Sequence, residues 1–201
     1  MVATHRLGVL TTFALLLVSG ASTAQDSGLA QRAREQDITV RIHSEYAPAD
    51  FGMLVSESDA IIIGTVTAGR SFLAGELIQT NYDVAVDRVI RRRPSSRVAQ
   101  GDVIVVRRAG GATTVERHTV IGDEADFPQF NAGATYVFFL TRTEQGTYFW
   151  PTYGPQGVFH LAEGKVRQVS EVFGSWNRER GPGVPLETFV GEVQQWVQPA
   201  Q

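Results

Sequence analysis

Arginines supply the one basic cluster in this chain, and guanidinium groups are the side chains best suited to hold phosphate or carboxylate oxygens. The cluster consists of Arg91, Arg92, Arg93, Arg97, Arg107 and Arg108. If the fold brings them together, they form a surface for an anionic glycan, a lipid phosphate or a nucleic-acid strand. Three aromatic residues could stack on such a ligand: Tyr82, Tyr148 and Trp150.

The same arginines also have an ordinary structural interpretation, in which their aliphatic stems cover apolar surface while their charged ends stay in water. The chain has 18 Lys and Arg residues against 21 Asp and Glu residues, for a net charge of -3. A weakly negative overall charge argues against nucleic acid as a partner. We therefore treat the cluster as a weak anion patch.

Histidines and carboxylates suggest a second kind of chemistry, the binding of a divalent cation. The candidates near residue 120 are Glu116, His118, Asp123, Glu124 and Asp126. Their spacing lacks the alternating Asp pattern of a calcium loop, and a solvated acidic loop explains them better. His43 and Glu45 are too few for zinc, and the apolar surroundings of His160 favour a packed histidine. We expect no metal site.

No catalytic motif accompanies these residues. The 201-residue chain has no Cys, and its Gly174-Ser175-Trp176 sequence lacks the second glycine of a nucleophile elbow. It also lacks a phosphate-binding P-loop and an H-E-x-x-H motif. Triad residues need not be close in sequence, so a hydrolase with a dispersed site remains an alternative. We favour a non-catalytic protein without a cofactor.

Residues 1–24 have the pattern of a cleaved secretory signal. His5 and Arg6 precede an apolar run from Leu7 to Val18, and small residues lead to a cleavage point after Ala24. The run is much shorter than the roughly 20 residues needed to cross a bilayer. The sequence predicts an exported protein, periplasmic or extracellular, without a membrane span.

Most of the remaining chain alternates like β-strands. Residues 25–47 are polar and include a short alternating strand at 37–43, and residues 48–58 predict a short helix with Asp50 as its cap. A bulge is expected near Val89 and Ile90. The other strands are expected at 60–68, 79–90, 102–107, 113–121, 135–141, 147–150, 158–161 and 165–169.

The last segment, 185–197, predicts an amphipathic helix that docks on the sheet. Its apolar residues recur at helical spacing: Leu186, Phe189, Val190, Val193, Trp196 and Val197. One core is expected from Ile62, Val66, Val84, Val86, Val105, Val137, Phe139 and Leu140. Short strands followed by one helix indicate a mainly β protein, a small antiparallel barrel of about five to seven strands in a single domain at 48–197.

The order of these signals resembles a group of secreted bacterial proteins with a barrel like the oligonucleotide/oligosaccharide-binding (OB) fold. The resemblance covers roughly residues 50–197 and rests on the segments 58–66, 82–90, 101–106, 127–130, 133–140 and 157–159. The topology is also remotely similar to the inhibitory domain of tissue inhibitors of metalloproteinases. Those inhibitors chelate zinc through an N-terminal Cys, and this chain has none, so the resemblance does not extend to that mechanism.

Taken together, the sequence favours a secreted, monomeric, non-catalytic binding or interaction module for an unknown protein or anionic ligand. The alternatives are an inhibitor or accessory partner of an extracellular protease and, third, the hydrolase with a dispersed site.

The signal pattern makes a direct prediction. When the full chain is expressed in a bacterial host and recovered from the periplasm or medium, N-terminal sequencing should find Gln25 first, because Ala24 completes the small-residue cleavage site. Recovery of exported protein that still begins with Met1 would contradict it.

Overall fold

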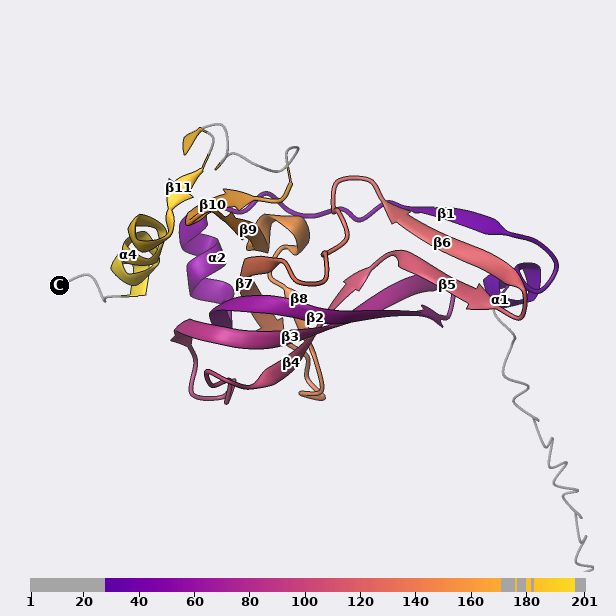
Figure 1. Cartoon of the computed structure of the whole chain (residues 1–201), viewed down its shortest axis with the longest axis horizontal. Coiled ribbons are helices and arrows are strands. Elements are labelled where there is room, and N and C mark those ends of the chain that lie inside the picture. The colour runs from indigo at the N-terminus through magenta and orange to yellow at the C-terminus, as the bar shows by residue number, and fades with distance from the viewer. Residues whose placement is uncertain (1–27, 171–175, 177–179, 182, 198–201) are drawn as a thin grey trace, which may run out of the picture.

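A computed structural model describes residues 28–170, 176, 180–181 and 183–197. The predicted signal at 1–24 and the Gly174-Ser175 pair lie outside the described residues. The described chain is mainly β, with a short helix toward the N-terminus and a helix at the C-terminal end, which confirms the predicted fold class (Figure 1). None of the helices described here is long and apolar enough to cross a membrane.

The larger sheet curves into a ring. Strand β2 pairs antiparallel with β3 on one side and with β7 on the other, and β3 pairs with β4. The ring closes because β8 pairs with β4 and also with β7. The bounds of these strands are β2 Ala60–Ala74, β3 Leu77–Arg92, β4 Val103–Ala109, β7 Thr135–Arg142 and β8 Phe149–Pro151.

Three further strands extend the same sheet outward from β7. They are β9 (Val158–Ala162), β10 (Lys165–Gln168) and β11 (Val184–Pro185), and each pairs antiparallel with the one before it. A short 3-10 helix, η1 (Gly154–Gly157), joins β8 to β9. This extension, rather than the ring itself, carries the chain toward its C-terminal helix.

Strand β2 opens with five buried residues because both of its faces are covered. Ile62 and Val66 face the interior of the ring, where they join Val84, Val86 and Leu140 in one apolar cluster. Ile61 and Ile63 face the other way and join Val137 and Phe139 in a second cluster. The single core expected from the sequence is therefore wrong, and Val105 belongs to neither cluster because successive residues of a strand point to opposite faces.

Two helices cover the second cluster. Helix α2 (Phe51–Glu57) begins after Asp50, whose side chain accepts a hydrogen bond from the Met53 amide at 2.8 Å. The predicted Asp50 cap is confirmed. The helix begins at Phe51, later than the expected start at residue 48, so Pro48 lies before it. The Phe51 ring packs on Phe189 of the C-terminal helix with centroids 5.5 Å apart.

The C-terminal helix α4 (Leu186–Val197) docks on the sheet through part of its apolar stripe. Phe189, Val190 and Val193 are buried. Trp196 and Val197, the last two residues of the stripe, remain 62% and 46% exposed. At this end of the helix the Trp196 ring lies beside Gly52 of α2, where an added Cβ would lie 2.8 Å from Cζ3 of Trp196.

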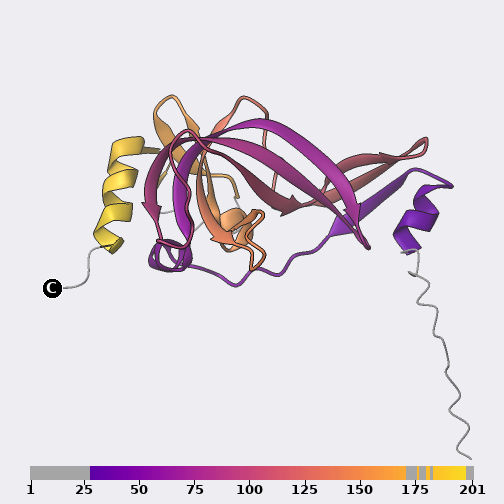
Figure 2. The ribbon, with the colours of Figure 1, turned by 90° about the horizontal axis from the view of Figure 1, so that it is seen from below.

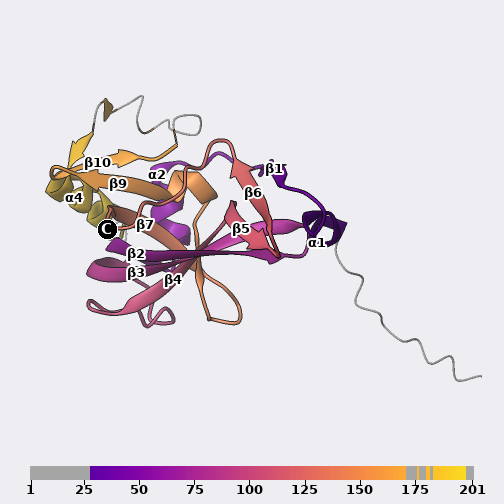
Figure 3. The same ribbon diagram turned by 45° about the vertical axis from the view of Figure 1, so that its right-hand side comes forward.

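A smaller sheet lies at the end of the molecule away from α4. It consists of β5 (Gly111–Val115), β6 (His118–Glu124) and β1 (Ile38–Ile42), with β1 parallel to β6. Helix α1 (Gly28–Ala33), which the sequence did not predict, packs Leu29 and Ala33 against Ile78 and Val120. The long strands β2 and β3 curve from the ring to this end (Figures 2 and 3).

The bulge expected in β3 is confirmed. Ile61 pairs with Arg91 and Ile62 pairs with Val89, so Ile90 is the extra residue. An extra residue bends the bulged strand and increases its twist, which helps a long strand follow the ring.

The packing of β7 predicts the effect of a cavity. Replacing the fully buried Phe139, which contacts Phe51 and Phe159, by Ala should lower the free energy of unfolding by about 3–5 kcal/mol. Urea unfolding measures this, with Val103→Ala as the control because Val103 is 64% exposed. Equal stabilities of the two variants would contradict the burial of Phe139 between the sheet and helices α2 and α4.

Candidate ligand-binding site

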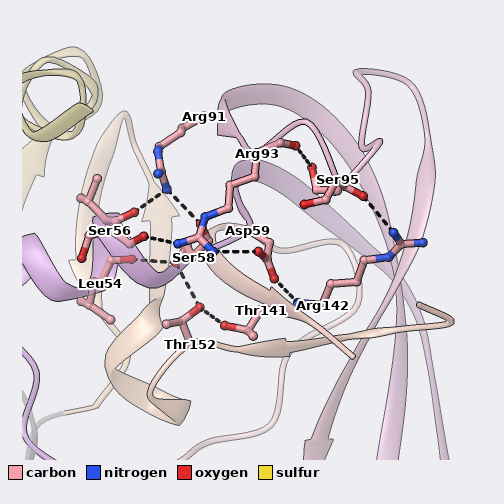
Figure 4. A network of polar contacts seen from close by, with 12 residues as sticks. Leu54, Ser56, Ser58, Asp59, Arg91, Arg93, Ser95, Thr141, Arg142 and Thr152 are labelled. Carbon is pink, nitrogen blue, oxygen red and sulfur yellow. Dashed lines mark hydrogen bonds and ion pairs between the residues drawn. The ribbon is translucent and has the colours of Figure 1, made fainter. Parts of the chain in front are cut away.

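Two arginines of the predicted patch, Arg91 and Arg93, hydrogen-bond to the C-terminal end of helix α2 instead of facing a ligand. Arg91 donates through Nη1 to the carbonyls of Val55 and Ser58, and Arg93 donates through Nη2 to the carbonyl of Ser56 (Figure 4). The last carbonyls of a helix have no donors within the helix. These arginines satisfy them and complement the negative end of the helix dipole.

The same network ties the end of α2 to the ring. Asp59 accepts from Arg93 at 3.4 Å and from the Arg142 amide at 2.8 Å (Figure 4). The Ser58 hydroxyl donates to the Leu54 carbonyl and contacts the Thr152 hydroxyl at 3.0 Å. The contacts join α2 to residues of β3, β7 and the segment after β8, so their role is structural.

The other four arginines lie in separate environments. Arg92 donates to the Val98 carbonyl, and Arg97 is exposed on the loop that follows β3. Arg107 donates from Nε to Asn81 at 2.7 Å and stacks 3.6 Å from the centre of the Tyr148 ring. Arg108 points the opposite way from Arg107 and is 1% exposed. The structure therefore does not assemble the six into one surface, and anion binding by the exposed members stays a prediction.

The three aromatic residues singled out in the sequence also separate. Tyr82 is buried inside the ring. Tyr148 and Trp150 are half-buried and contact each other edge to face, with centroids 5.9 Å apart. Trp150 connects this outer surface with a pocket that Arg108 lines.

Arg108 is the buried cation of this pocket. Its Nη2 donates to the Phe127 carbonyl and lies 3.4 Å from Oε2 of Glu124, which is also buried. Its guanidinium carbon lies 4.6 Å from the centre of the Phe127 ring. Nε and Nη1 have no hydrogen-bond partner among the described residues. Leaving a buried donor without an acceptor costs about 1–3 kcal/mol, and more when the group is charged.

Glu124 is held from its other side by Tyr46. The Tyr46 hydroxyl donates to Oε1 of Glu124 at 2.6 Å. Burial raises the pKa of Tyr46 above its ordinary value, and the hydrogen bond to Glu124 raises it further, so the phenol stays protonated and keeps donating. Glu124 thus interacts with both Tyr46 and Arg108, and neither contact involves Nε or Nη1 of Arg108.

A tight approach positions the Tyr46 ring. Gly154 has φ +59°, and a Cβ at this position would lie 2.2 Å from Cε1 of Tyr46. Only glycine leaves that space and readily adopts this backbone conformation. The residues around Tyr46 are held by Gln156, which accepts from the Ala49 amide and donates to the Ala47 carbonyl, each at 2.9 Å.

The pocket has a volume of about 360 Å³ and is largely apolar and aromatic. Its lining residues are Ser44, Tyr46, Arg108, Ala109, Phe127, Trp150, Pro151, Tyr153 and Gly154. Ligand pockets typically combine such walls with a small number of placed polar groups. We refer to it as the Arg108 pocket.

A second pocket of about 400 Å³ shares Ser44, Tyr46 and Phe127 with the first. It brings His43 and Glu45 together with Glu124 and Asp126. Within the described part of the chain, no group of three or more His, Asp or Glu side chains is placed to hold a metal ion.

The three histidines with candidate roles do not meet. His118 lies 3.5 Å from Asp37 at the end of the smaller sheet. His160 packs on Tyr136, with ring centres 5.3 Å apart, beside a third pocket of about 280 Å³. Only His43 shares a pocket with the acids near Glu124. A dispersed hydrolase site would need histidines and acids close together, and of these three histidines only His43 lies near such acids.

Sequence reasoning missed the pairing of Arg108 with Glu124 and did not consider Tyr46. The signal for Arg108 was present, because Ile104, Val106 and Arg108 occupy alternate positions of β4 and share one face. The opposite face carries Val103, Val105 and Arg107 and looks equally apolar, so alternation alone does not say which face is buried.

Comparison with known proteins does not identify a family for this chain. The sequence matches no protein-family model, and no match is found among curated proteins.

The arginine contacts at α2 predict a stability difference. Arg91→Gln should lower the free energy of unfolding by about 1–3 kcal/mol, since the Val55 and Ser58 carbonyls lose a charged donor. Arg97→Gln, on the exposed loop, should change it by less than about 0.5 kcal/mol. Chemical denaturation distinguishes them, and an equally small effect of both changes would remove the assigned role of Arg91.

Proposed function

We propose that this protein is an exported, non-catalytic binding module that holds a small ligand in the Arg108 pocket. One observation carries the proposal: a buried guanidinium with two unpartnered nitrogen atoms lines an apolar pocket of about 360 Å³. Export rests on the predicted signal at 1–24, and the OB-like resemblance is compatible with a binding role.

The pocket has the composition of a binding site more than of a catalytic one. Phe127, Trp150 and Tyr153 provide walls against which a ligand can bury apolar surface. Catalysis would need a nucleophile or an acid-base group placed beside the ligand. The Tyr46 phenol is held neutral by burial and by its bond to Glu124, so it serves to orient that carboxylate.

The alternatives of a protease partner and a hydrolase remain predictions. The acids beside His43 give the hydrolase a specific observation, since a carboxylate and an imidazole share one pocket wall. The two candidate functions differ in a measurable way, because a hydrolase releases a product and a binding module does not.

A matched pair of tryptophan variants tests the proposal. Trp150 lines the pocket, whereas Trp196 lies exposed on α4. A library of small acids, amides, amines and sugars is screened by thermal unfolding of the mature chain. A ligand at one hundred times its Kd stabilises the folded state by about 2.7 kcal/mol. We expect at least one class to raise the Tm of the wild type and Trp196→Ala, but not of Trp150→Ala.

Two results would contradict this expectation. Equal stabilisation of Trp150→Ala would place the ligand elsewhere. A mass change in the recovered ligand would show turnover and favour the hydrolase.

A further inference from the structure

We propose that the ligand of the Arg108 pocket is a small organic monocarboxylate with an apolar body, an inference that rests on the proposed function. Its carboxylate would bind the unused nitrogen atoms of Arg108. Its body would lie against Phe127, Trp150 and Tyr153.

The donor inventory of Arg108 points to an acceptor. A guanidinium carries five N–H groups, and those on Nη2 serve Glu124 and the Phe127 carbonyl. Those on Nε and Nη1 have no acceptor among the described residues. A ligand oxygen at these atoms removes the cost of burying them unpaired.

Charge selects the carboxylate over a neutral group or a cation. Hydrogen bonds between a guanidinium and an ionised acceptor are about twice as strong as neutral ones. The contact of Arg108 with Glu124 is long at 3.4 Å, and Tyr46 donates to Glu124 at 2.6 Å. The guanidinium therefore keeps capacity for a second anion, while an ammonium ligand would be repelled by it.

The rest of the lining sets the size and shape of the ligand. Arg108 is the only cation among the residues that line the described pocket, so a phosphate dianion would be left undercompensated. Most of the other lining residues are apolar or aromatic, including Ala109, Phe127 and Pro151. A single carboxylate on an aromatic or aliphatic body matches both properties.

Access to the guanidinium passes by Tyr46. The unused nitrogen atoms are buried, and Tyr46 lines the pocket from residues 43–50, which form neither helix nor strand. A movement of this segment in which the Tyr46 hydroxyl still donates to Glu124 would bring a ligand oxygen to Arg108 without disturbing a strand of the ring.

Three compounds of one shape test the inference by isothermal titration calorimetry on the mature chain. They are 3-phenylpropanoate, 3-phenylpropanamide and 3-phenylpropylamine. The acid should bind at least about tenfold more tightly than the amide, because only the acid forms a charge-assisted bond, and the amine should not bind. This comparison uses the wild type alone and needs no variant to fold.

Two arginine variants then locate the contact. Arg108→Lys should weaken binding of the acid by about tenfold or more, since a lysine ammonium does not reproduce the planar donor geometry. Arg107→Lys, on the opposite face of β4, should leave affinity within about twofold. Circular dichroism and the Tm confirm that both variants are folded.

The outcomes separate this inference from the proposed function. If the amide or the amine binds as tightly as the acid and is lost in Trp150→Ala, the pocket binds ligands but the carboxylate assignment is overturned. If the acid binds equally to wild type and Arg108→Lys, Arg108 is not its partner and the inference fails. If none of the three compounds binds, the inference is overturned, and the proposed function is decided by the library screen.

Discussion

The burial of β2 on both faces is the constraint on which the other elements depend. Because Ile62 faces the interior of the ring while Ile61 and Ile63 face α2 and α4, one strand belongs to two apolar clusters. A continuous apolar run can exist in a sheet only when both faces are covered. The ring must therefore close on one side through β8, and the helices must dock on the other. Arg91 and Arg93 hold α2 in that position by satisfying its last carbonyls.

The candidate site follows from where the ring meets the smaller sheet. The alternation of β4 turns Arg108 inward at the end of the strand, and the pairing of β6 with β5 and β1 brings Glu124 beside it. Residues 43–50 leave β1 and pass the ring, which places Tyr46 between Glu124 and the pocket. A charged pair with unused donors, buried between two sheets, is costly to fold unless something binds there. That cost supports a functional role for the pocket.

Several elements could be predicted from local patterns because their causes are local. The Asp50 cap needs only the amide three residues later, the β3 bulge shows as a break in alternation, and α4 shows as helical spacing of apolar residues. Helix α1 could not be predicted, since its short apolar side gains stability only against Ile78 and Val120. The environment of Trp196 likewise depends on tertiary packing, because its partly exposed ring lies beside Gly52 of α2.

By itself the sequence determined the mainly β character, the approximate positions of most strands and the two flanking helices, because alternation and capping are properties of neighbouring residues. The single strand expected at 113–121 is wrong, because the chain turns at 116–117 and forms the hairpin of β5 and β6. Tertiary structure alone decided which face of each strand is buried. It divided the expected core in two. It also placed the arginines in different environments: Arg91 and Arg93 at a helix end, Arg107 on an outer aromatic ring and Arg108 in the interior. Tyr46 precedes Glu124 by 78 residues and lies outside the strands, so only the tertiary fold brings it to the Arg108–Glu124 pair.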